Sequence, residues 1–202
     1  MMMNKVYQLI KTVGIVGLLL VLTASAQAQV VGVKTNILYL ATASPNIGIE
    51  WPMGKHFTGS LGGGYNPFRF GEYQDSEGNT INSKLHHWMG SGEVRYWFCE
   101  RFVGWNMGVN VFGGEYNVGG ISFIHALKEN RFKGWGVGAG VTVGYQVVLS
   151  ARWGLDFSVG GGYVYTEYSK YEGCACGEEL GRYKKRIWGP TKGAVSVVYF
   201  LR

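Results

Sequence analysis

Two adjacent histidines, His86 and His87, are the residues of this sequence best suited to moving protons. A histidine paired with a hydroxyl or a carboxylate is what nucleophilic catalysis of acyl transfer requires. Such side chains stand in the preceding segment, at Asp75, Ser76 and Ser83. Neighbouring residues of a strand point to opposite faces, so the two histidines cannot enter one site. No spacing marks a triad, and we predict no catalytic residues; a rim enzyme that uses His87 is the alternative.

Three cysteines offer a second kind of chemistry. Cys174 and Cys176 are separated by one residue, and Cys99 lies far away in the sequence. Outside the cytoplasm such a pair can form a disulfide, and we expect one that stabilises a loop. Free thiols and a metal-binding pair are the alternatives. Two thiolates supply only half of a zinc site, and His125 is the one loop histidine that could join them, so we predict no metal and no cofactor.

The pattern that must position these residues has a period of two. In residues 135–147, WGVGAGVTVGYQV, mostly large apolar side chains occupy the odd positions, and glycine, Thr142 and Gln146 occupy the even ones. Strict alternation over this length predicts a strand with one apolar face and one small or polar face. The glycines at 134, 136, 138 and 140 are followed by no helix, so they do not form a nucleotide-binding loop. We expect them to let a narrow barrel close.

The same pattern predicts eight strands and no second domain. The strands cover residues 31–41, 45–53, 57–66, 87–98, 102–114, 135–148, 153–165 and 188–201. Most have the roughly 9–11 residues that a tilted strand needs to cross a bilayer. Short connections alternate with long ones, an asymmetry typical of outer-membrane barrels. The short ones are 53–56, 99–101 and 149–152, the long ones are 67–86, 115–134 and 167–187, and the first outer loop, 42–44, is an exception because it is short.

Parity places three cations and three carboxylates on the polar faces of these strands. They are Lys34, Glu50, Glu93, Arg95, Asp156 and Lys192. The interior of a small barrel is filled by side chains, and buried charges must pair to offset their desolvation. The balanced set therefore predicts an ion-paired lumen and an apolar exterior, the inverse of a soluble barrel that binds apolar ligands. A soluble β-sandwich is the alternative that alternation by itself leaves open.

The seven tryptophans all fall at strand ends, where amphipathic aromatic residues mark the two interfaces of a membrane barrel. Parity points five of them outward, and we expect these to lie at the membrane interfaces: Trp51, Trp88, Trp105, Trp135 and Trp153. The same parity points Trp97 and Trp188 inward. That conflict predicts a bulge near Pro190 or an error in the register.

The N-terminal segment has the features of a secretory signal peptide. Lys5 and Lys11 form a basic segment before a short apolar run at residues 13–22. A cleavage site of small residues follows at 24–26 or 26–28. The run is shorter than the roughly 20 residues that a membrane-spanning helix needs. Any membrane residence must therefore use strands.

These features predict a signal peptide at residues 1–26 and one barrel domain at residues 27–202. The domain is expected to be all-β: an eight-stranded antiparallel up-and-down transmembrane β-barrel with a filled polar lumen. The expected location is the cell outer membrane. The formal net charge of +6 is modest and does not argue for nucleic acid.

Seven motifs resemble, in order, those of one known family. They are KTNILYLATASPNIGIEW (34–51), GGYNPF (63–68), EVRYWFCERFVG (93–104), GGEYNVGGI (113–121), RFKGWGVGAGVTVGYQ (131–146), RWGLDFSVGGGYVY (152–165) and GPTKGAVSVVY (189–199). The family is a Bacteroidota family of small outer-membrane β-barrel proteins catalogued as a domain of unknown function. The resemblance implies an outer-membrane barrel, and the frequent position of its members near fimbrial genes implies surface-structure biogenesis. It carries over no catalytic residue.

The C-terminus departs from general outer-membrane practice. Such barrels commonly end in an aromatic residue, whereas this chain ends Tyr199-Phe200-Leu201-Arg202. The departure weakens the expected recognition by the insertion machinery.

We expect a non-enzymatic barrel that acts in envelope structure, adhesion or fimbrial and other surface-structure biogenesis through its outer loops. The expected partners are outer-membrane lipid and lipopolysaccharide, the barrel-assembly machinery during insertion, and a surface or fimbrial protein. The charged fourth loop, 167–187, is expected to be solvated, with contact to lipopolysaccharide phosphates or a protein as the alternative. Two further alternatives are a lipid- or peptide-modifying enzyme with His87 at the rim and a narrow solute channel.

Overall fold

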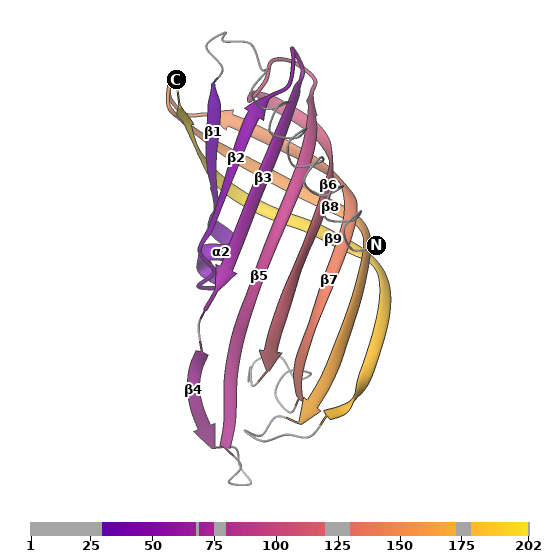
Figure 1. Ribbon diagram of the computed structural model, residues 1–202. Coiled ribbons are helices and arrows are strands. Elements are labelled where there is room, and N and C mark those ends of the chain that lie inside the picture. The colour runs from indigo at the N-terminus through magenta and orange to yellow at the C-terminus, as the bar shows by residue number, and fades with distance from the viewer. Residues whose placement is uncertain (1–29, 68, 75–79, 120–129, 173–178, 202) are drawn as a thin grey trace, which may run out of the picture.

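The computed structural model describes residues 30–67, 69–74, 80–119, 130–172 and 179–201 (Figure 1). The elements within these ranges are β1 (Val31–Asn36), α2 (Ile37–Ala41), β2 (Asn46–Pro52), β3 (Phe57–Asn66), β4 (Arg69–Gln74), β5 (Thr80–Trp97), β6 (Gly104–Gly119), β7 (Asn130–Val148), β8 (Trp153–Glu172) and β9 (Glu179–Leu201). No helix in the described part of the chain is long and apolar enough to cross a membrane. The predicted signal peptide lies outside the described residues.

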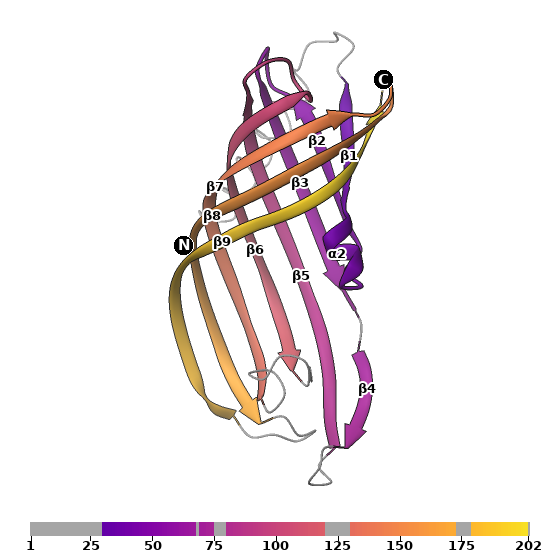
Figure 2. The ribbon, with the colours of Figure 1, turned by 180° about the vertical axis from the view of Figure 1, so that it is seen from behind.

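Eight of the strands close into one antiparallel ring (Figures 1 and 2). The ring follows chain order, except that β3 pairs directly with β5, and β9 returns to pair with β1. The short strand β4 pairs only with β5, beyond the point where β3 ends. The prediction of an all-β fold with eight antiparallel strands in an up-and-down barrel is therefore confirmed.

The two ends of the barrel differ. The connections at residues 53–56, 98–103 and 149–152 lie at one end, together with the start of β1 and the end of β9, and we call this the turn end (top of Figure 1). The opposite end, toward which β4 and the long parts of β5 to β9 extend, is the loop end. The wall is thus taller along β5 to β9 than along β1 to β3.

The predicted long loops are wrong in part, because strand pairing runs far into them. Residues 67–86 contain β4 and the start of β5, and β6 to β9 extend into the other two loops. Apolar and polar residues alternate less strictly in these segments, so the sequence gives a weaker strand signal there. The backbone ladder nevertheless continues, because its hydrogen bonds do not depend on side-chain type.

The predicted first strand, 31–41, is correct only up to Asn36, where α2 begins. The side-chain oxygen of Asn36 accepts hydrogen bonds from the backbone N–H of Leu38 (3.1 Å) and of Val195 (3.2 Å). Its amide nitrogen donates to the carbonyl oxygen of Gly193 (3.3 Å). An asparagine that bonds nearby backbone offers the chain an alternative to the ladder, so β1 ends here and a helical turn follows.

The bulge predicted near Pro190 is confirmed. The register of β8 against β9 shifts where Thr191 is left without a partner, between Pro190 and Lys192. Because one extra residue reverses the alternation, Trp188 faces outward instead of inward. It is 79% exposed, and its ring lies 5.5 Å from that of Tyr163.

Trp97 faces inward, as its parity predicts, and its side chain is fully buried. No bulge is therefore needed to explain its position. Trp97 belongs to an apolar cluster that closes the lumen at the turn end, with Phe102, Val198 and Phe200. The ring of Phe102 lies 5.9 Å from that of Trp97 and 5.5 Å from that of Phe200. The lumen is filled as predicted: its middle is polar, and this apolar cluster fills it at the turn end.

Candidate functional site

The structure brings together the six charged residues that parity placed inside. Lys34, Glu50, Glu93, Arg95, Asp156 and Lys192 reach into the lumen from β1, β2, β5, β8 and β9. Three carboxylates and three cations occupy one interior space, so the set is neutral as a whole. We call it the lumen charge network.

Arg95 is the centre of the lumen charge network. Its Nη1 and Nη2 donate to the two oxygens of Asp156 at 2.9 and 3.1 Å, and its Nε donates to Glu93 at 2.7 Å. Nη1 also lies 3.8 Å from Glu50. The Arg95 side chain is only 1% exposed. A planar guanidinium with five donors suits this arrangement, because it can satisfy several carboxylates at once.

Two lysines and two threonines complete the pairing of the carboxylates. Lys34 donates to Glu50 and Lys192 donates to Glu93, each at 2.6 Å. Threonine hydroxyls bind the remaining oxygens, with Thr58 donating to Glu50 at 2.5 Å and Thr142 donating to Glu93 at 2.6 Å. Every carboxylate of the network therefore has at least one cation, which is what burial of a charge requires.

The threonines were not singled out from the sequence, although their parity placed them on the same inward faces. Thr58 also accepts a hydrogen bond from the indole N–H of Trp97 at 2.9 Å. It thus links the lumen charge network to the apolar cluster at the turn end. Its place among the small and polar even positions of residues 57–66 was the signal that could have found it.

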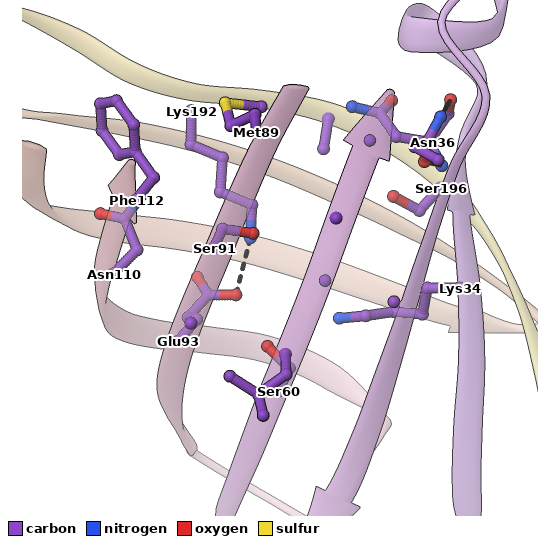
Figure 3. A pocket seen from close by; sticks show the side chains of 18 of the residues that line it. Lys34, Asn36, Ser60, Met89, Ser91, Glu93, Asn110, Phe112, Lys192 and Ser196 are labelled. Atoms are coloured by element: carbon purple, nitrogen blue, oxygen red, sulfur yellow. Dashed lines mark hydrogen bonds and ion pairs between the residues drawn. The ribbon is translucent and has the colours of Figure 1, made fainter. Parts of the chain in front are cut away.

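A cavity of about 130 Å³ lies on the loop-end side of the lumen charge network (Figure 3). Lys34, Glu93 and Lys192 border it, and Met89 and Phe112 contribute apolar surface. Two buried oxygens of lining residues, Oδ1 of Asn110 and Oγ1 of Thr191, have no hydrogen-bond partner among the described residues. A space of this size can hold several water molecules. The cavity suits water or a small polar molecule with hydrogen-bond donors.

Close packing explains why glycines line the inner wall beside this cavity. A Cβ on Gly140 would lie 2.6 Å from the carbonyl oxygen of Gly161 and 3.0 Å from Oδ1 of Asn110. No side chain larger than hydrogen fits there without movement of the wall. The expectation that these glycines let a narrow barrel close agrees with this geometry.

The two histidines face opposite ways, as strand alternation requires. His86 points outward, and its Nε2 lies 3.4 Å from the hydroxyl of Tyr65. His87 shares the inward parity of Glu93 and Arg95, and no hydrogen bond joins it to a serine, aspartate or glutamate within the described ranges. Asp75 and Ser76 lie outside the described residues. The alternative of a rim enzyme that uses His87 therefore stays untested, because its other candidate side chains are not described.

The tryptophans predicted to face outward do so. Trp88, Trp105, Trp135 and Trp153 are exposed, and Trp51 is half-exposed. Three of them pack edge-to-face with outward tyrosines: Trp105 with Tyr145, Trp153 with Tyr199 and Trp135 with Tyr165. The first two pairs lie toward the turn end and the third toward the loop end.

Between these aromatic groups the outer wall is apolar. The exposed side chains here are Ile47, Ile49, Leu61, Val94, Met107, Val109, Val111, Val141, Val143, Phe157 and Val159, and we call them the apolar belt. The short helix α2 continues the apolar surface with Ile37, Leu38 and Leu40. Large apolar groups thus surround the middle of the barrel, while the lumen charge network lies inside it.

Of the three cysteines, only Cys99 lies within the described residues. Cys174 and Cys176 lie outside the described residues, so the predicted disulfide stays a prediction. Cys99 is free and exposed in the connection between β5 and β6. Within the described ranges, no group of three histidine, cysteine or acidic side chains is arranged to hold a metal ion.

Part of the predicted fourth loop forms the loop-end parts of β8 and β9. Lys184 is paired with Glu167 at 2.9 Å and is 73% exposed. A hydrogen bond from Tyr165 and the charge of Lys184 lower the pKa of Glu167 below its usual value. Since these groups are open to water, this ion pair contributes little to stability.

A closed eight-stranded barrel with a neutral, ion-paired lumen places this chain among small antiparallel β-barrel proteins. Residues 14–201 match the family described as "Protein of unknown function (DUF3575)", and the chain belongs to that family. No curated protein matches the chain. The expectation that the chain belongs to a family catalogued as a domain of unknown function is thereby confirmed.

Proposed function

We propose that the chain is a non-enzymatic outer-membrane β-barrel protein that acts in envelope structure, adhesion or surface-structure biogenesis. In this proposal a cleaved signal peptide carries the chain across the inner membrane, and the barrel-assembly machinery inserts it. The turn end faces the periplasm, and the loop end faces outward and meets lipopolysaccharide and a surface or fimbrial protein. Short periplasmic turns and longer outer connections are the usual arrangement in such barrels.

The apolar belt is the single observation that carries the proposal. Val109, Val141 and Val159 are each 60–68% exposed on the outer wall, although Arg95 and Asp156 are buried inside. A soluble protein rarely exposes a continuous apolar surface of this kind, and it would place its apolar groups in the interior. The same arrangement costs nothing in a bilayer, where lipid chains cover the belt.

The lumen charge network supports a structural role over a channel. Arg95 joins β5 to β8 across the interior, and the apolar cluster of Trp97, Phe102 and Phe200 fills the lumen at the turn end. Both features oppose a continuous path for water and ions. In a planar bilayer we expect the purified protein to give no steady conductance, and discrete ion-conducting events would favour the channel.

Fractionation and unfolding in lipid test membrane residence directly. The full chain is expressed in a bacterial host, and its mature form is expected at outer-membrane density in a sucrose gradient. The folded barrel is expected to migrate faster in unheated gel samples than in boiled ones, because detergent does not open a closed barrel. Purified mature protein that stays monomeric and folded without detergent or lipid would overturn the proposal.

A further inference from the structure

The loop-end half of β9 has a backbone edge with no strand beside it. β1 pairs with β9 only over residues 196–201. Next to those pairs, on the loop-end side, Asn36 forms hydrogen bonds with Gly193 and Val195. The chain then enters α2 and no longer pairs with β9. Within the described ranges, residues 179–192 pair with β8 on one side and with no strand on the other. Figure 2 shows this part of β9 as the last strand of the tall wall.

Such an edge is a template for another strand. Its N–H and C=O groups point away from the sheet, and an extended peptide can bind them by adding one more strand. In the hydrocarbon of a membrane these groups would be costly if left unpaired. The charges along the edge instead indicate that it lies in water, at or above the headgroups.

The edge carries an excess of positive charge. Residues 179–190 contain four cations, Arg182, Lys184, Lys185 and Arg186, and one acid, Glu179. Glu167 of β8, paired with Lys184 at 2.9 Å, offsets one further charge. Two of the cations, Lys184 and Arg186, share one face of β9, and Lys185 lies on the other. Like charges directly opposite each other destabilise a pair of strands, so a second copy of β9 fits this edge poorly. Pro190 and the bulge at Thr191 further oppose unselective pairing.

We propose that residues 179–190 of β9 bind an extended acidic segment of another protein by β-strand addition. Backbone hydrogen bonds supply the affinity, and carboxylates at alternate positions of the partner, which share one face of the added strand, meet Lys184 and Arg186 on that face. This proposal gives a partner class to the proposed surface role, and it rests on that role only for placing the loop end outside the cell.

Three synthetic peptides test the proposal on the mature chain refolded in detergent micelles. The first alternates glutamate and valine, the second has the same sequence with every backbone amide N-methylated, and the third has lysine in place of glutamate. We expect the first peptide to slow amide hydrogen exchange at residues 179–192 by at least about tenfold. The second peptide is expected to fail because it lacks donors, and the third because its charge is wrong.

A charge-reversed protein is the matched control. The variant with both Lys184→Glu and Arg186→Glu should no longer bind the glutamate peptide and should bind the lysine peptide. The gel-mobility shift on heating shows that the barrel of this variant is folded. Equal binding of the N-methylated peptide would overturn strand addition, since charge alone would then suffice. Protection of the same amides by vesicles of anionic phospholipid, and not by the glutamate peptide, would assign the cations to lipid phosphates instead. Membrane residence is measured separately by the gradient, so either proposal can fail without the other.

Discussion

Arg95 of β5 and Asp156 of β8 form a two-point ion pair across the lumen, although 61 residues separate them in the sequence. The two strands are not neighbours in the ring, so the pair joins opposite parts of the wall. Both side chains are 1% exposed. Water cannot replace either partner, which makes the lumen charge network sensitive to the loss of a single member.

Arg95→Met is expected to lower the free energy of unfolding by about 3–5 kcal/mol, because it leaves Asp156 and Glu93 short of a cation. Urea unfolding in lipid vesicles measures the change. Adding Asp156→Asn to the same protein should restore part of the loss, since one uncompensated charge is then removed. Equal stability of Arg95→Met and the native chain would show that the network contributes nothing.

Trp97→Phe keeps an aromatic ring in the apolar cluster and removes the indole N–H that donates to Thr58. We expect a loss of about 1–3 kcal/mol in unfolding free energy, which combines a missing hydrogen bond and a smaller ring. Thr58→Val removes the other partner, and a double-mutant cycle separates the two effects. Strict additivity of the two substitutions would contradict a direct interaction.

Gly108→Ala tests the close packing of the inner wall. Its Cβ would lie 2.7 Å from the carbonyl oxygen of Val94 and 2.9 Å from Oγ1 of Thr142, so the strands must separate. We expect a loss of about 1–3 kcal/mol, as is usual for overpacking. Gly90→Ala is the control, because nothing lies within 4 Å of its Cβ. Similar stability of the two variants in urea would argue against a tightly closed barrel.

Val141→Arg tests whether lipid covers the apolar belt. In a membrane, arginine at the middle of the belt is expected to cost about 2–4 kcal/mol of unfolding free energy. Val103→Arg makes the same chemical change in the connection at the turn end and should cost much less. Unfolding in vesicles measures both. If both changes are neutral, the belt faces water, and the proposed membrane residence is wrong.

The alternation of residue types was enough to predict most of the barrel. β3 spans the predicted residues, and the inward parity of Lys34, Glu50, Glu93 and Arg95 followed from counting along each strand. Counting works because a strand side chain has only two directions. Counting gave the wrong direction for Trp188, on the loop-end side of the bulge at Thr191, because one unpaired residue reverses the parity there.

Local competition set the limits of other elements. β1 ends at Asn36 because its side chain binds Leu38, Gly193 and Val195, and two of those partners come from the far end of the chain. β4 and the loop-end parts of β5 to β9 form by backbone pairing in segments whose sequence shows no clear period of two. Sequence patterns report which face of a strand is buried, and the sequence of these segments shows no such pattern.

The sequence by itself determined that the chain forms alternating strands and that opposite charges balance on their inward faces. Only the tertiary structure decided that Arg95 meets Asp156, that Lys34 meets Glu50, and that no described strand pairs with one side of residues 179–192 of β9. The reason is physical: a period of two specifies the side of the wall on which a group lies. Closure, tilt and register bring particular groups from distant strands within hydrogen-bond distance.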